Sequence, residues 1–296
     1  MPRTHAIAVV QALFVTFLWA TSWVLIKIGL EDIPALTFAG LRYGLATLVL
    51  LPFVLRGEPL AALRALPART WRALVVLGLV WYALTQGAQF LALAYLPAAT
   101  ASLVLSFSPV LVALGAAAAL GERVVLRQSL GIGVYLVGAL VYFSPAALPR
   151  DQLVGLGIAV VGLLANAAAS VLGRSVNRTA TVSPVVVTVV SMAVGSAALL
   201  GTGLTLQGLP ALSLQSWAII AWLAVVNTAL AFTLWNATLR HLSAVESSVV
   251  NNTMLVQIAI LAWLFLGESL SAGQIVGICL AAVGALIVQL RGWDGR

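Results

Sequence analysis

Long apolar runs separated by short polar segments dominate this sequence. Runs of about 20 residues recur ten times in 296 residues, and a helix needs about that length to cross ~30 Å of hydrocarbon. The runs are apolar on every side, whereas strands of a membrane barrel alternate over about ten residues. The pattern predicts an all-α integral membrane protein with ten transmembrane helices. Their expected positions are 7–29, 35–55, 73–95, 97–120, 129–145, 153–173, 183–204, 217–238, 244–266 and 271–290.

The composition supports a membrane location. Hydrophobic residues make up 62% of the chain and charged residues 8%, whereas a soluble domain has about 25% charged residues. A soluble fold of this size has too few polar side chains here to cover its surface. The single cysteine, Cys279, excludes an intrachain disulfide and a cysteine metal cluster, and no cofactor is expected.

The basic residues predict the orientation. Twelve of the 15 Lys and Arg residues lie at the two termini and in the even-numbered loops, while the odd-numbered loops hold only Arg150. Cytoplasmic loops accumulate these residues, so both termini are expected in the cytoplasm. The net charge of +7 then follows from topology and gives no reason to expect a nucleic-acid partner.

An internal repeat is the most informative feature. A shift of 146 residues aligns 71–140 with 217–286 without a gap, and about a third of the pairs are identical, including Trp71 with Trp217 and Glu122 with Glu268. Each half, 1–146 and 147–296, holds five predicted helices, so the second half enters the membrane from the opposite side. Such inverted repeats are typical of transporters, whose substrate site lies at the repeat interface. Duplication retained for packing alone is the alternative.

Two segments carry a family resemblance. Tyr95-Leu-Pro-Ala-Ala-Thr-Ala-Ser-Leu, with Pro109 and Leu120-Gly-Glu-Arg123 after it, resembles the ten-helix EamA-type branch of the drug/metabolite transporter superfamily, and Leu266-Gly-Glu268 resembles the end of a second unit. The resemblance implies metabolite export across the cell inner (plasma) membrane. A narrower similarity is to YddG-type exporters of aromatic amino acids. Leu255 stands where the second repeat of such proteins often has proline, so the two halves are expected to bend differently.

The first predicted helix carries candidate substrate-binding residues. Trp19, Trp23 and Lys27 lie at i, i+4 and i+8, on one helix face. The equivalent positions of the second repeat carry a polar face. The aromatic face and the polar face together suit a ligand with an aromatic body and a charged head. Lipid-facing tryptophans and a lysine reaching the membrane surface are the alternative. The equivalent positions in the second repeat are Asn166, Ser170 and Arg174.

Other polar residues in the spans are costly in lipid and are expected to face the interior, either lining a cavity or holding helices together. Arg42 binds a substrate carboxylate or is a structural charge. Glu246 is the only carboxylate expected inside a span, and it either titrates or lies at a helix N-terminus. Pro109 is expected to kink its helix at a gate. The other substrate-binding candidates are Tyr82, Gln86, Ser102, Asn227, Trp235, Ser248, Asn251 and Asn252.

The sequence therefore predicts a secondary transporter that exports small neutral or zwitterionic metabolites by alternating access. Amino acids with aromatic or hydrophobic side chains fit best, and a proton or an exchanged substrate is the possible coupling partner. A polyspecific drug or nucleoside/sugar exporter of the same superfamily is an alternative, as is a membrane scaffold or receptor. An intramembrane enzyme is excluded because His5 and His241 lie near the chain end and in a loop, and no zinc-protease pattern is present.

Overall fold

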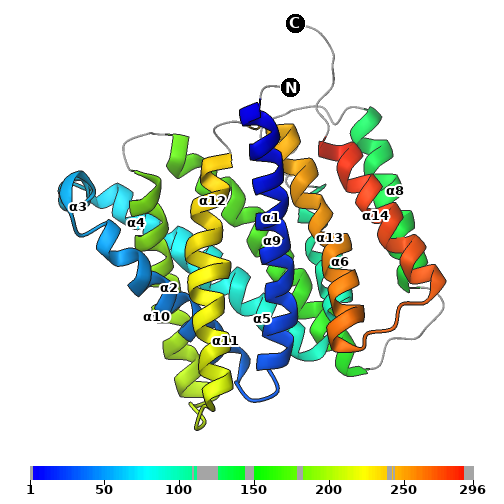
Figure 1. Ribbon diagram of the computed structural model, residues 1–296, viewed down its shortest axis with the longest axis horizontal. Helices are drawn as coiled ribbons and strands as arrows, with labels where there is room; N and C mark the ends of the chain where they lie inside the picture. Colours follow the sequence, from blue (N-terminus) through cyan, green and yellow to red (C-terminus); the bar gives the residue numbers. More distant parts are fainter. Residues whose placement is uncertain are drawn as a thin grey trace, which may run out of the picture. The chain divides into compact units, whose positions relative to one another are not determined.

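The computed structural model describes residues 3–108, 110–111, 126–143, 150–178, 183–238, 242 and 244–289, and over these residues the secondary structure is helical, without strands. Two compact units draw on both halves of the sequence. Unit 1 comprises Met1–Val24, Leu96–Leu156 and Leu230–Arg296, and unit 2 comprises Leu25–Tyr95 and Gly157–Ala229. Figure 1 labels the helices.

The helices follow the predicted apolar runs closely, within a few residues at most ends. An additional short helix, α3, lies in the second loop and was not predicted. In chain order the elements are α1 Arg3–Gly29, α2 Ala35–Leu50, η1 Leu51–Phe53, α3 Gly57–Arg64, α4 Ala68–Gly78, η2 Leu79–Gln86, α5 Gly87–Tyr95, α6 Ala98–Leu105, α8 Leu126–Phe143, α9 Arg150–Arg178, α10 Pro184–Leu206, α11 Leu214–Ala224, η3 Val225–Leu230, α12 Ala231–Thr238, α13 Ala244–Leu266 and α14 Ala272–Gln289.

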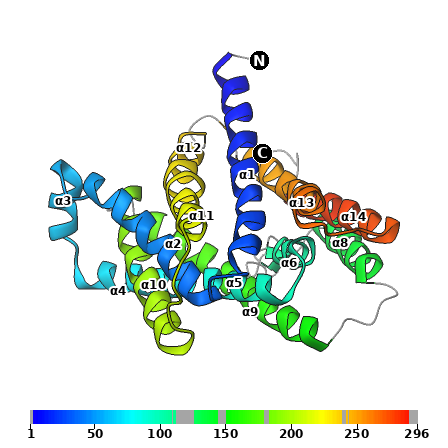
Figure 2. The ribbon, with the colours of Figure 1, turned by 60° about the horizontal axis from the view of Figure 1, so that its bottom comes forward.

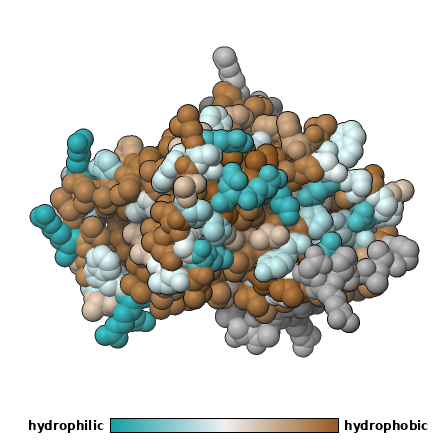
Figure 3. Space-filling model, turned by 90° about the horizontal axis from the view of Figure 1, so that it is seen from below, coloured by the Kyte–Doolittle hydropathy of each residue, from teal (hydrophilic) through white to brown (hydrophobic). Residues whose placement is uncertain are grey.

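Five helical stretches in the described part of the chain are long and apolar enough to cross a bilayer, and shorter apolar helices accompany them. Large apolar side chains such as Leu126, Leu140 and Trp263 are exposed, and apolar residues cover much of the surface drawn in Figure 3. A surface of this kind is unfavourable in water and is expected where lipid surrounds the protein. The long stretches are His5–Gly29, Ala35–Phe53, Ala68–Tyr95, Gln152–Gly173 and Pro184–Leu206.

In unit 1, α8 packs along α14, and Figures 1 and 2 both show the two helices side by side. Glycines permit the close approach. A Cβ on Gly138 would lie 2.5 Å from the nitrogen of Ala281 and 2.7 Å from the oxygen of Gly277. A Cβ on Gly284 would meet the backbone of Tyr135 and Gly131 in the same way. A shift of 146 residues converts each contact into the other, so the two repeat-related helices meet reciprocally.

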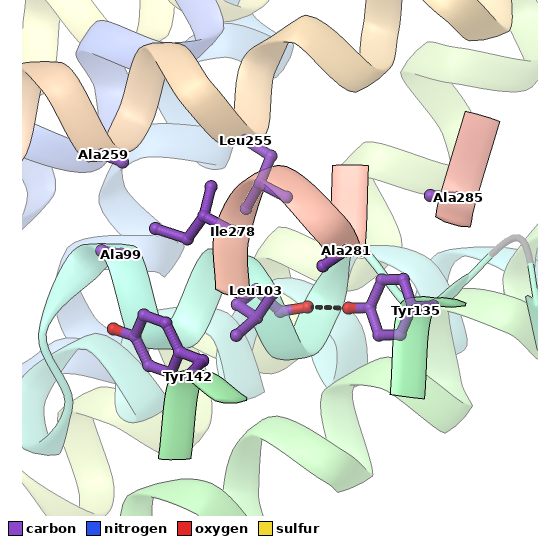
Figure 4. Packing of buried hydrophobic residues seen from close by; sticks show 9 residues of the cluster. All are labelled: Ala99, Leu103, Tyr135, Tyr142, Leu255, Ala259, Ile278, Ala281 and Ala285. Atoms are coloured by element: carbon purple, nitrogen blue, oxygen red, sulfur yellow. Dashed lines mark hydrogen bonds between the residues drawn. The ribbon is translucent and has the colours of Figure 1, made fainter. Parts of the chain in front are cut away.

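A buried cluster of apolar side chains joins α6, α8, α13 and α14 in unit 1 (Figure 4). Two tyrosines of α8 turn their hydroxyl groups towards α6. Tyr135 donates a hydrogen bond to the carbonyl oxygen of Leu103, and the hydroxyl of Tyr142 lies 2.8 Å from that of Thr100. These bonds satisfy polar groups that would otherwise be buried without partners.

Helix α6 ends earlier than the sequence pattern indicated. The expected span reaches residue 120, with a kink at Pro109. In the structure α6 ends at Leu105, Ser106 and Phe107 form a turn, and the chain is helical again at Ser108, Val110 and Leu111, so the helix is interrupted just before the position of the expected kink. A proline has no N–H for the carbonyl four residues back, and its ring clashes with that carbonyl, which explains why the helix is interrupted in the preceding turn. The helix of the second repeat, α13, runs unbroken through the equivalent position, Leu255, so this expected difference in bending is observed. Pro109 itself lies outside the described residues.

The Leu-Gly-Glu motif of the second repeat has a clear structural role. Gly267 follows the last residue of α13 and has φ +65°, a left-handed conformation that favours glycine. The carboxylate of Glu268 then accepts hydrogen bonds from the N–H groups of Ala98 at 2.7 Å and Ala99 at 3.3 Å, at the start of α6. An acidic side chain is favourable at a helix N-terminus, so this loop caps a helix of the first repeat.

In unit 2, α2 packs against α10. A Cβ on Gly40 would lie 2.6 Å from the backbone of Leu200, and a Cβ on Gly203 would lie 2.5 Å from the nitrogen of Thr37, so glycine allows the backbones to approach. After α10, Gln207 Oε1 accepts a hydrogen bond of 2.8 Å from the N–H of Leu36. The loop after α10 therefore holds the beginning of α2 in place.

Two π-helical segments were not anticipated. They are η2 and η3, and their first residues, Leu79 and Val225, are 146 residues apart. Within them, Thr85 Oγ1 donates to the carbonyl of Val80 at 2.9 Å and Thr228 Oγ1 donates to that of Leu223 at 2.8 Å, each five residues back. π-Helical turns inside α-helices are frequent at functional sites, and these two interrupt the helices at repeat-equivalent positions.

Candidate functional site

The buried guanidinium of Arg42 is the central feature of the candidate site in unit 2. Arg42 is 4% exposed, and its Nε donates a hydrogen bond of 3.1 Å to Thr228 Oγ1. Its guanidinium carbon lies 5.1 Å from the ring centroid of Tyr43 and 5.9 Å from that of Phe90. In the described part of the chain its partners are a hydroxyl and aromatic rings, with no carboxylate among them.

Thr228 fixes the direction of this contact. Its hydroxyl proton is used on the carbonyl of Leu223, so its oxygen is left to accept from Arg42. The terminal nitrogens of the Arg42 guanidinium keep their N–H donors, in the fork geometry that suits a carboxylate. The π-helical turn η3 brings this threonine to Arg42.

A chain of aromatic and amide groups extends from Arg42. Tyr43 donates its hydroxyl proton to Gln86 Oε1 at 2.6 Å, and its ring lies 5.5 Å from that of Tyr82, edge to face. Trp81 stacks with Tyr82, with 6.0 Å between the ring centroids. Tyr82 and Gln86 both lie on η2, four residues apart, so the second π-helical turn also contributes to the site. Two predicted site residues, Tyr82 and Gln86, thus lie in the same group as Arg42.

Unit 1 holds a second aromatic group. The ring centroid of Trp19 lies 5.1 Å from that of Trp235 and 5.3 Å from that of Phe232. Trp19 and Trp235 are half-buried, and Trp23, one turn further along α1, is buried. Trp19 and Trp235 were both predicted as site residues, and α1 and α12 bring them into direct contact.

Lys27 has a partner that favours a structural role. Its Nζ donates a hydrogen bond of 2.6 Å to the carbonyl oxygen of Leu93, in the last turn of α5. Lysine at a helix C-terminus stabilises the exposed carbonyl groups there. A role in ligand binding is therefore not needed to account for its charge.

The other predicted residues are more scattered. Asn227 is fully buried on η3, Ser102 donates to the carbonyl of Ala99 in its own helix, Asn166 is half-buried on α9, and Asn251 is exposed on α13. Four predictions lie outside the described residues or side chains, and they remain predictions: Pro109, Glu246, Ser248 and Asn252.

Sequence reasoning missed several residues of these groups. Tyr43 and Thr228 are the direct partners of Arg42, and Gln257 lies beside Thr16 and Thr253 in unit 1. A glutamine in an apolar run is a signal that was available, because such a group is costly in lipid. Thr228 carried no comparable signal, since its contact depends on the π-helical turn.

Comparison with known proteins places the chain in a family. The EamA-like transporter family matches residues 6–144 and again residues 153–290. The chain belongs to the EamA-like transporter family. It is therefore a membrane transporter of small molecules and not an enzyme.

Several EamA relatives match over most of the chain. The probable amino-acid metabolite efflux pump of Escherichia coli (strain K12) is 27% identical over 294 residues, covering 94% of this chain and 93% of that protein. The uncharacterized transporter YyaM of Bacillus subtilis (strain 168) is 24% identical, covering 84% and 82%. A solved crystal structure has the same fold, with a TM-score of 0.67 and 22% identity, and covers 95% of this chain and 96% of that one.

Proposed function

We propose that this EamA transporter exports amino acids with aromatic or hydrophobic side chains, and that Arg42 binds their carboxylate. The observation that carries the proposal is the environment of Arg42. Its buried guanidinium is held at Nε by Thr228 and lies next to the rings of Tyr43 and Phe90. Among the described residues it has no carboxylate partner. A charge in a membrane-spanning segment is expensive unless it is paired, and such residues mark substrate pathways.

The surrounding side chains suit an amino acid. The free fork of the Arg42 guanidinium can form two parallel hydrogen bonds with a carboxylate. Tyr43, Tyr82 and Phe90 add apolar and aromatic surface next to it, on which a hydrophobic side chain packs favourably. The name of the Escherichia coli relative, a probable amino-acid metabolite efflux pump, supports the same substrate class.

The proposal includes the membrane arrangement. The chain would have ten helices as two inverted five-helix repeats, residues 1–146 and 147–296, with both termini in the cytoplasm and the protein in the inner (plasma) membrane. The reciprocal glycine contacts of α8 and α14 and the two successive family matches support the repeat. Alternating access then follows from rocking of repeat-related elements, and the substrate biases that equilibrium only through contacts that differ between the two states.

Reconstitution into liposomes tests the proposal. Purified protein is supplied with radiolabelled amino acids, nucleosides and sugars, and saturable flux is expected for phenylalanine, tryptophan or leucine. Arg42→Gln should lower that flux at least about tenfold, because the carboxylate loses its charged partner. Arg72→Gln, which changes an exposed arginine of α4, is the matched control and should behave as wild type. Flux of nucleosides or sugars alone, unchanged in Arg42→Gln, would contradict the proposal.

Coupling is tested in the same liposomes. We propose exchange or downhill flux. Glu246 is the one carboxylate in a predicted span, and it would be the candidate group if transport were coupled to protons. An imposed pH gradient should leave the final distribution of substrate unchanged. Uphill accumulation driven by the gradient would instead establish proton coupling.

A further inference from the structure

Gln257 of α13 has an amide group whose orientation is determined by its neighbours. Its Nε2 lies 3.0 Å from Thr253 Oγ1 and 3.3 Å from Thr16 Oγ1. Both hydroxyl groups donate hydrogen bonds to backbone carbonyls. Thr16 donates to Leu13 at 2.9 Å, and Thr253 donates to Val250 at 2.6 Å. Each oxygen can then only accept, so the amide nitrogen, and not the amide oxygen, must face the two threonines.

The amide oxygen of Gln257 is therefore committed to a different direction. Gln257 Oε1 is buried and has no hydrogen-bond partner among the described residues. Flipping the amide would not help, because it would turn the oxygen towards two groups without a free proton. A buried acceptor without a donor is costly and uncommon in folded proteins, so this atom needs an N–H or O–H donor that the described residues do not supply.

A second buried polar atom without a hydrogen-bond partner in the described part of the chain lies on α1. Trp19 follows Thr16 by three residues, on the same face of the helix, and its Nε1 is buried without a hydrogen-bond acceptor in the described part of the chain. Its ring contacts Phe232 and Trp235 of α12. Unit 1 thus combines an unused acceptor, an unused donor and aromatic faces on α1, α12 and α13.

We propose that Gln257, Trp19 and Trp235 form a specificity site for an aromatic ring that carries a hydroxyl or N–H group. The ring lies against the tryptophans, Gln257 Oε1 accepts a hydrogen bond from the hydroxyl or N–H group of the ligand, and Trp19 Nε1 donates one to an acceptor such as a phenol oxygen. The substrate class rests on the function proposed above. This group in unit 1 is a binding site of its own for such substrates, in addition to the Arg42 group, and it favours side chains of the tyrosine and tryptophan kind. Phenylalanine would leave both atoms unpaired, and a site built to bind a hydroxyl discriminates strongly against an analogue that lacks it.

Transport of tyrosine and phenylalanine by the full-length protein in liposomes tests the site. The wild type should prefer tyrosine in kcat/KM by about tenfold or more. Gln257→Leu should bring the two values to within about twofold, mainly by loss of tyrosine transport. Gln11→Leu is the matched control, because Gln11 lies in the same unit and donates to the carbonyl of Leu234, and it should keep the preference. An equal loss of both substrates in Gln257→Leu, or no preference in the wild type, would overturn the site.

A binding measurement without a carboxylate separates this site from the Arg42 proposal. The melting temperature of the purified wild type should rise more with p-cresol than with toluene, and the difference should vanish in Gln257→Leu. If p-cresol binds in this way while no amino acid is transported, the proposed function fails and the site stands. If amino acids are transported but p-cresol acts no better than toluene, water alone occupies the site and the inference is wrong.

Discussion

The hydroxyl of Tyr135 donates a hydrogen bond to the carbonyl oxygen of Leu103, close to the end of α6. Ser106 donates to the same carbonyl at 2.7 Å, and Phe107 N–H bonds to Val104 instead of Leu103. Side chains thus replace the helical hydrogen bond that is lost where α6 ends. The second repeat has Ala281 at the position of Tyr135, and its helix α13 is unbroken.

Tyr135→Phe is expected to destabilise the protein by about 1 kcal/mol, because one hydrogen bond to a buried carbonyl is removed while the ring remains. Unfolding by SDS or heat in detergent measures the change. Tyr95→Phe is the matched control, since Tyr95 is 44% exposed, and should change stability little. Equal effects of the two substitutions would mean that the hydroxyl of Tyr135 has no special role.

Glu268→Ala should cost about 1–2 kcal/mol, because the N–H groups of Ala98 and Ala99 lose their acceptor and α6 loses a favourable charge at its N-terminus. Glu268→Gln keeps an acceptor oxygen and should cost less. Glu31→Ala, at an exposed position, serves as the control in the same unfolding measurement. A Glu268→Ala variant as stable as Glu31→Ala contradicts the capping role.

Gly138→Ala and Gly133→Ala make the same change at two positions of α8 with opposite expectations. The new Cβ at Gly138 would overlap the backbone of α14, whereas nothing lies within 4 Å of the Cβ position at Gly133. Gly138→Ala should therefore destabilise the protein by ~1–3 kcal/mol, and Gly133→Ala should be neutral or slightly stabilising. Equal stabilities would rule out tight packing of α8 on α14.

The proposed orientation is tested by labelling single cysteines with a membrane-impermeant maleimide. Cys279, which is exposed, is first replaced in Cys279→Ser, and Glu58→Cys or Arg150→Cys is then added. The arginine distribution predicts that residue 58 reacts only from the cytoplasmic side and residue 150 only from the outside. Reaction of both from the same side would refute the ten-helix topology.

Much of the fold could be read from the sequence, because hydrophobic length is what a bilayer selects. The ends of α2, α5, α10 and α13 lie close to the predicted spans. The interruption after α6 could be predicted from Pro109, whereas the π-helical segments η2 and η3 could not be predicted in the same way. They depend on local hydrogen bonds, such as those of Thr85 and Thr228 to carbonyls five residues back, which leave the hydrophobic pattern unchanged.

The candidate site was predictable only in part. Arg42, Tyr82 and Gln86 stand out as polar or amphipathic groups in apolar runs, and the structure brings them into one group. Lys27 stood out for the same reason but bonds to a helix end. Sequence shows which groups need partners in a membrane, whereas the partners themselves depend on helix packing.

The central claim, that Arg42 binds the substrate carboxylate, is tested most directly by comparing phenylalanine with phenylalaninamide, which lacks the carboxylate. Their inhibition constants are measured against flux of a labelled amino acid in liposomes that contain wild type or Arg42→Gln. In the wild type phenylalanine should bind at least about tenfold more tightly, and in Arg42→Gln the two constants should become similar. A preference for phenylalanine that is undiminished in Arg42→Gln would show that another group binds the carboxylate.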